Sequence, residues 1–160
     1  MGPGAPDAAA EVEVDETGEV RIPVAHIAID CGPRVNPDRV RSQMEGAVVM
    51  GTGQALMSQI TFANGRAQQD NFDSYLVPRM DSSPREIHVH LVGGGDYGQP
   101  LGGVGEPGLP PVTPAITNAI FAATGKRIRA LPVADQLRSF PNERYAEPSE
   151  AIAELLRVQV

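Results

Sequence analysis

One glycine- and proline-rich stretch constrains this chain more than any other feature. It reads Gly102-Gly103-Val104-Gly105-Glu106-Pro107-Gly108. Gly105 has access to backbone dihedrals closed to other residues, and it lets a ligand approach the main chain closely. Pro107 restricts Glu106 to an extended conformation, because the proline ring clashes with a helical residue before it. The stretch therefore predicts a loop that aims one carboxylate, that of Glu106, in a fixed direction.

A helix over residues 114–124 is predicted directly after this loop. Thr113 is a suitable N-cap and Pro114 suits the first helical position. Gly125 is the natural end of the helix. Residues at helical spacing give it one apolar face: Ile116, Ala119, Ile120 and Ala123.

A longer helix is predicted over residues 37–57, with Asn36 as N-cap and Pro37 in the first turn. Its apolar, close-packing face consists of Val40, Met44, Ala47, Val48 and Gly51. Glycine inside a helix costs about 1 kcal/mol relative to alanine. We therefore expect another backbone or a ligand to come close to Gly46, Gly51 and Gly53.

Short strands account for much of the remaining chain. The candidates are residues 11–14, 20–29, 59–63, 66–71, 87–92 and 128–133. Residues 15–18 have turn chemistry and predict a hairpin between the first two candidates, with an edge or bulge at Pro23. Asn64-Gly65 predicts a second hairpin. The expected fold is α+β, with two main helices and a mostly antiparallel sheet of four or five strands.

Composition and charge exclude several classes of function. The 160 residues suffice for one domain with a core, and 17 Gly, 15 Pro and 4% aromatic residues predict a loop-rich chain. The net charge of -7 argues against nucleic-acid or anionic-membrane partners. We expect no transmembrane segment and no signal peptide. The single cysteine, Cys31, cannot form an internal disulfide or supply the four thiolates of an iron–sulfur cluster.

His88 and His90 lie on one face of the predicted strand 87–92 and are spaced to share a metal ion. Together with Cys31 they define one hypothesis, a metal-binding module. No third ligand is evident beside the two histidines, so an exposed strand face is the favoured interpretation. We predict no metal ligands among the side chains of this chain.

Two segments resemble one known family. Residues 103–128 read Gly-Val-Gly-Glu-Pro-Gly-Leu-Pro-Pro-Val-Thr-Pro-Ala-Ile-Thr-Asn-Ala-Ile-Phe-Ala-Ala-Thr-Gly-Lys-Arg-Ile. They resemble the C-terminal signature of the molybdopterin-binding subunit in the xanthine dehydrogenase family, closest to the isoquinoline oxidoreductase beta-subunit branch and its aldehyde dehydrogenase relatives. Val35-Asn36-Pro37 and Gln43-Met44-Glu45-Gly46-Ala47 resemble the same family's pterin-contacting segment, and residues 71–80 are also similar. The resemblance spans residues 12–133.

The resemblance implies a role for each of three residues. Glu106, in Val-Gly-Glu-Pro, is implied to be the catalytic base beside molybdenum. Gln43 is implied to contact the pterin, and Gly105 to lie against the cofactor. The implied cofactor is molybdenum-molybdopterin cytosine dinucleotide, and its site is incomplete in this chain.

The implied reaction is water-dependent oxidation of an aldehyde or an N-heterocycle, with electrons passed to a small 2Fe-2S subunit. The family's upstream glycine-rich loops are missing, so the chain corresponds to the C-terminal portion and the rest of the subunit is an implied partner. The alternative is a stand-alone non-catalytic remnant, or a half-subunit that needs a separately encoded N-terminal piece. The compartment stays open between cytoplasm and periplasm.

Three parts are expected along the chain. Residues 1–10 are predicted to be a flexible leader, and residues 11–133 a C-terminal molybdopterin-binding-type domain. Residues 134–160 form a tail unlike the family's usual ending, with a short amphipathic helix beginning near Pro148.

Overall fold

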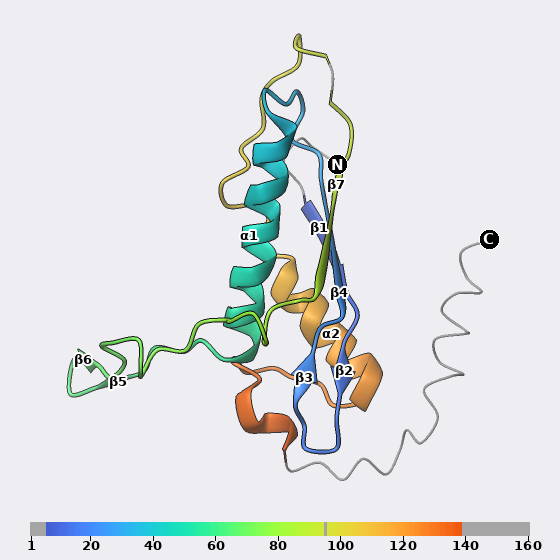
Figure 1. Cartoon of the computed structure of the whole chain (residues 1–160). Coiled ribbons are helices and arrows are strands. Elements are labelled where there is room, and N and C mark those ends of the chain that lie inside the picture. The colour runs from blue at the N-terminus through green and yellow to red at the C-terminus, as the bar shows by residue number, and fades with distance from the viewer. Residues whose placement is uncertain (1–5, 95, 139–160) are drawn as a thin grey trace.

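A three-stranded sheet packs against two helices in the computed structural model, which describes residues 6–94 and 96–138. The sheet contains β1 (Pro6–Ala10), β4 (Val24–Ile29) and β7 (Glu86–Leu91). The helices are α1 (Pro37–Leu56) and α2 (Val112–Thr124) (Figure 1). No helix within the described residues is long and apolar enough to span a membrane.

The strand β4 is central to this sheet. It pairs antiparallel with β1, so that Pro6 lies opposite Ile29, and parallel with β7, so that Val24 lies opposite Glu86. Parallel strands need a crossover connection, and α1 lies in the segment that joins β4 to β7.

Two separate hairpins complete the strands: β2 (Glu13–Val14) with β3 (Val20–Arg21), and β5 (Phe62–Ala63) with β6 (Arg66–Ala67). Both pairings are antiparallel, as is β1 with β4. The α+β class with two helices and mostly antiparallel strands is confirmed. The expectation of a single sheet of four or five strands is wrong, because the hairpins stand apart from β4.

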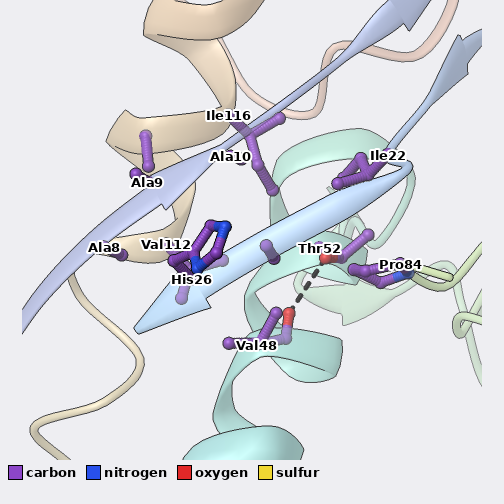
Figure 2. A pocket seen from close by; sticks show the side chains of 12 residues that line it. Ala8, Ala9, Ala10, Ile22, His26, Val48, Thr52, Pro84, Val112 and Ile116 are labelled. Carbon is purple, nitrogen blue, oxygen red and sulfur yellow. Dashed lines mark hydrogen bonds between the residues drawn. The ribbon is translucent and has the colours of Figure 1, made fainter. Parts of the chain in front are cut away.

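The core lies between β4 and the two helices. Alternate residues of β4 point into it, and it is lined by Ala25, Ile27, Ile29, Val40, Met44, Val48, Val112, Ile116 and Ile120. A cavity of about 10 Å³ remains between the sheet and the helices, barely the size of one water molecule (Figure 2). Beside it, the buried hydroxyl of Thr52 donates a 2.9 Å hydrogen bond to the Val48 carbonyl oxygen.

The start of α1 and two of its glycines agree with the sequence. The Asn36 side chain accepts a 3.2 Å hydrogen bond from the Arg39 backbone N–H. A Cβ atom at Gly51 would lie 2.7 Å from the Val112 side chain, so this glycine lets α2 approach α1. A Cβ atom at Gly53 would lie 2.7 Å from Pro78. Only open space surrounds the corresponding position at Gly46.

The start of α2 differs from the prediction. The helix begins at Val112, and Thr113 is not its N-cap. The Thr113 hydroxyl instead donates to the Gly51 carbonyl oxygen at 3.4 Å. Val112 is buried against Gly51 and extends the apolar face toward the N-terminus, whereas Ala123 at the other end is exposed. Gly125 ends the helix with a φ of 69°, as expected.

The described chain ends also differ from the predictions. Residues 6–10, assigned to a flexible leader, form β1 because their backbone pairs with β4. Residues 128–133 form no strand: Ile128 and Val133 are buried, and the Val133 N–H donates to the Ala55 carbonyl oxygen at 2.7 Å. The 3-10 helix η1 (Ala134–Leu137) then adds Leu137 to the core. The helix expected near Pro148 lies outside the described residues.

Both predicted hairpin turns are confirmed. Asn64 and Gly65 have φ values of 52° and 76°, the left-handed region that a type I′ turn requires. In the β2–β3 turn, Asp15 Oδ1 accepts hydrogen bonds from the Thr17 hydroxyl at 2.7 Å, the Thr17 N–H at 2.9 Å and the Glu19 N–H at 3.0 Å. The Thr17 hydroxyl, followed by the Glu19 N–H, lowers the pKa of Asp15 from its ordinary 3.8.

Candidate functional site

The loop of residues 102–108 lies against α1 and is attached to the body at both ends. At its start, the Gly102 N–H donates a 2.8 Å hydrogen bond to the Cys31 carbonyl oxygen. At its end, Gly108 is buried so closely that a Cβ atom would lie 2.9 Å from both the Ala47 methyl and the Met44 sulfur. Both attachments position the residues between them.

Gln43 makes the contact at the middle of the loop. Its side-chain Nε2 donates a 2.8 Å hydrogen bond to the Gly105 carbonyl oxygen. The two motif segments identified in the sequence therefore meet in space. The Gln43 side-chain oxygen accepts no hydrogen bond within the described part of the chain, so one polar atom of the same amide stays available.

Glu106 directly follows this contact and is exposed. Its carbonyl oxygen accepts from the Leu109 N–H at 3.1 Å in the turn that leads to α2. Its carboxylate forms no hydrogen bond or ion pair with residues 6–94 or 96–138. The loop thus presents an uncommitted carboxylate at the surface, next to a backbone held by Gln43.

Glycines leave the outer side of the loop open. No atom lies within 4 Å of the Cβ position at Gly103 or Gly105. Gly105 does not have a positive φ, so its proposed use of forbidden dihedrals is wrong. Close approach by another molecule is the remaining physical reason for a glycine there. The N–H groups of residues 103–106 donate no hydrogen bond to the described residues, so they too are available to a ligand.

These groups fit one edge of a polar organic cofactor. A side-chain amide oxygen, a row of backbone N–H groups and glycines without side chains suit the amide-rich edge of a pterin or a phosphate. Only α1 and one loop contribute them. A cofactor fixed in a cleft needs contacts from more segments to offset its lost freedom, so the site in this chain is partial.

The histidines form a second cluster, on the sheet face away from the helices. His26 Nδ1 lies 3.2 Å from His90 Nε2, a hydrogen-bond distance in which one ring donates and the other accepts. The His26 ring also stacks on that of His88, with centroids 5.0 Å apart. The sequence interpretation missed His26, although alternation along residues 24–29 already placed it on the non-core face.

The cluster does not form the metal-binding module considered from the sequence. Cys31 is buried in the core, whereas His88 and His90 are exposed on the other face of the sheet. His88 Nε2 lies 3.2 Å from the Glu86 carboxylate. Among the described residues, no three His, Cys, Asp or Glu side chains are placed to hold one metal ion.

Comparison with known proteins identifies the family. Residues 6–84 match the model of the molybdopterin cofactor-binding domain. The chain is 42% identical over 106 residues to isoquinoline 1-oxidoreductase subunit beta of Brevundimonas diminuta, which covers 66% of this chain and 13% of that protein. This chain belongs to the xanthine dehydrogenase family of molybdopterin-binding subunits. The family recognised from the two motif segments is confirmed.

Two further members of the xanthine dehydrogenase family extend the comparison. The chain is 40% identical over 129 residues to a probable xanthine dehydrogenase polypeptide of Bacillus subtilis (strain 168), covering 79% of this chain and 17% of that protein. The solved aldehyde oxidoreductase of Desulfovibrio gigas superposes with a TM-score of 0.69 at 28% identity, covering 79% of this chain and 14% of the other.

The extent of these matches bears on the loop. A continuous match to 79% of a 160-residue chain necessarily includes both Gln43 and Glu106. The model of the cofactor-binding domain, in contrast, ends at residue 84 and contains only Gln43. The chain spans less than one fifth of the length of each of these family members.

Proposed function

We propose that this chain is the C-terminal part of a molybdenum hydroxylase subunit that carries out water-dependent oxidation of an aldehyde or an N-heterocycle. The hydrogen bond from Gln43 to Gly105 carries this proposal, because it joins the two motif segments directly beside Glu106. The names of three similar proteins support the substrate classes, since they act on isoquinoline, xanthine and aldehydes.

Glu106 is proposed as the general base. Its carboxylate is exposed and uncommitted within the described residues, so it is free to accept a proton from the water that supplies the oxygen atom. When bound, the molybdenum centre would supply the two-electron oxidation of the substrate. This chain would contribute a placed base and would hold the loop that carries it.

Gln43 and Gly105 are proposed as cofactor contacts. The Gln43 amide already spends one hydrogen on the Gly105 carbonyl oxygen, which leaves its own oxygen to accept from the pterin. At Gly105 the missing side chain gives access to the backbone N–H. The proposed form of the cofactor is the cytosine dinucleotide, and the remainder of a molybdopterin-binding subunit would supply the rest of its cradle.

The electron acceptor is proposed to be a separate 2Fe-2S subunit. Cys31 is the single cysteine of the 160 residues and is buried in the core. The thiolates of an iron–sulfur cluster must therefore come from another segment or another polypeptide.

The test is a chimaera. This chain replaces the matching stretch of the Brevundimonas diminuta beta subunit, and the chimaera is produced with the partner subunits of that enzyme. Molybdenum per polypeptide and dye reduction are measured with isoquinoline and with an aldehyde. We expect retained molybdenum and oxidation of at least one substrate. The alternative, a non-catalytic remnant, predicts a folded chimaera that retains molybdenum poorly and oxidises neither.

The isolated chain is the control for this experiment. Because its site is partial, reconstitution with the cofactor should leave no stoichiometric molybdenum after gel filtration. A half-subunit that needs a separate N-terminal piece would give the same result alone, but would retain molybdenum once that piece is added.

A further inference from the structure

Residues 58–83 form an arm that leaves the body after α1 and returns before β7 (Figure 1). The arm carries the β5–β6 hairpin at its far end. No residue of the arm is buried, whereas β4 and both helices contribute buried residues on either side of it. The arm therefore takes almost no part in the core of this chain.

Polar contacts give the arm its shape. Near the hairpin, Gln69 Oε1 accepts from the Thr61 N–H at 2.7 Å, and Gln69 Nε2 donates to the Thr61 hydroxyl at 3.0 Å. At its base, the Ser58 hydroxyl donates to the Leu76 carbonyl oxygen at 2.8 Å, which ties the outgoing and returning segments together. An isolated two-stranded hairpin is marginally stable in water, so these bonds define the path of the arm without giving it a core.

Large apolar side chains project from the arm into solvent. Phe72 is 82% exposed and Met80 is 96% exposed, and Phe62, Leu76 and Ile60 are exposed as well. Single exposed apolar residues are ordinary, but a concentration of them within one short segment marks an interaction site. The arm has the composition of a buried segment without a covering partner.

The charges and the family match indicate what covers it. The arm holds two arginines and three aspartates, so it has no excess of positive charge to attract a lipid surface or a nucleic acid. The cofactor-binding domain model spans residues 6–84 and so contains the whole arm. The relatives are at least five times longer than the part matched here. The missing surface therefore lies in the remainder of such a subunit.

We infer that the arm is the docking surface through which this chain binds the remainder of a molybdopterin-binding subunit, with Phe72 and Met80 inserted into that partner. This inference rests on the proposed function. It adds a surface remote from the Gln43–Glu106 loop, whose role is attachment of the two parts.

The experiment uses the whole chain and a named probe, the Brevundimonas diminuta beta subunit from which the matching stretch has been deleted. Binding is measured by calorimetry and by co-elution in gel filtration. The test variant is F72S/M80S, and the matched control is V92S/L131S, whose two side chains are about half exposed on the body. Thermal unfolding of both variants should match that of the parent, because none of the four side chains is buried.

We expect the parent and the control to bind alike, and F72S/M80S to bind at least about tenfold more weakly, as befits central apolar anchors. Equal binding by parent and F72S/M80S would overturn the inference about the arm and leave the proposed function standing. Absence of binding by the parent would instead count against the proposed function. A dimer of this chain that F72S/M80S abolishes would assign the arm to a second copy and so refute the inference.

Discussion

The side-chain amide of Gln43 donates a 2.8 Å hydrogen bond to the carbonyl oxygen of Gly105, 62 residues further along the chain. The bond attaches the exposed face of α1 to the peptide that immediately precedes Glu106. Since the loop is otherwise anchored only at Gly102 and Gly108, this bond restrains its central residues. The geometry of the candidate site therefore depends on a single side chain.

Replacing Gln43 by alanine tests this dependence. The loss of one exposed hydrogen bond should lower the free energy of unfolding by about 0.5–1.5 kcal/mol. Amide hydrogen exchange at residues 103–106 should become faster than in the parent. Gln54→Ala is the control, because Gln54 is exposed on the same helix and has no hydrogen-bond partner in the described part of the chain. Unchanged exchange in the loop of Gln43→Ala would show that the loop holds its shape without this bond.

Two glycines of α1 should respond to alanine in opposite directions. At Gly51 the new methyl group would lie 2.7 Å from Val112, so Gly51→Ala should destabilise the chain by about 1–3 kcal/mol through overpacking. At Gly46 the same change meets no atom within 4 Å and should stabilise the helix by about 0.5–1 kcal/mol. Urea unfolding of the two variants measures both. Similar shifts of the same sign would contradict the described helix crossing.

Asp15 should give the β2–β3 hairpin a dependence on pH. Hydrogen bonds from Thr17 and Glu19 lower its pKa below 3.8 in the folded chain. A lowered carboxyl pKa stabilises the fold fully above 3.8, and the contribution is lost as the pH falls through the folded value. Asp15→Ala should therefore lower Tm at pH 7, and the gap to the parent should narrow below pH 3.8.

The matched control for Asp15 is Asp73→Ala in the arm, an exposed aspartate whose side chain has no partner among the described residues. Its Tm should follow that of the parent at each pH. A difference between Asp15→Ala and the parent that is constant from pH 7 to pH 2.5 would show that the charge of Asp15 has no role in the turn.

The parts of the fold that follow from local chemistry were predictable from the sequence. The Asn36 cap, the Asn64-Gly65 turn and the end of α2 at Gly125 each depend on residues adjacent in the chain. The start of α2 was missed because tertiary packing decides it: Val112 is buried against Gly51, which outweighs the capping preference of Thr113.

Pairings between distant segments were beyond the sequence alone. Residues 6–10 have little strand character of their own, and they form β1 because β4 offers an unpaired edge. The parallel register of β4 with β7 places His26 beside His88, and no local pattern specifies that register. For the site, the motifs indicated Gln43, Gly105 and Glu106 separately. The bond between the first two appears only in the structure.

The turnover of Glu106→Gln in a complete, molybdenum-loaded enzyme containing this chain tests the central claim most directly. Glutamine keeps the size of the side chain and removes its basic oxygen. Because Glu106 is exposed, stability should change by no more than about 0.5 kcal/mol. We predict that kcat at equal molybdenum occupancy falls by about a hundredfold or more, as expected for a lost general base. A kcat within a few-fold of the parent would contradict the assignment of Glu106 as the base.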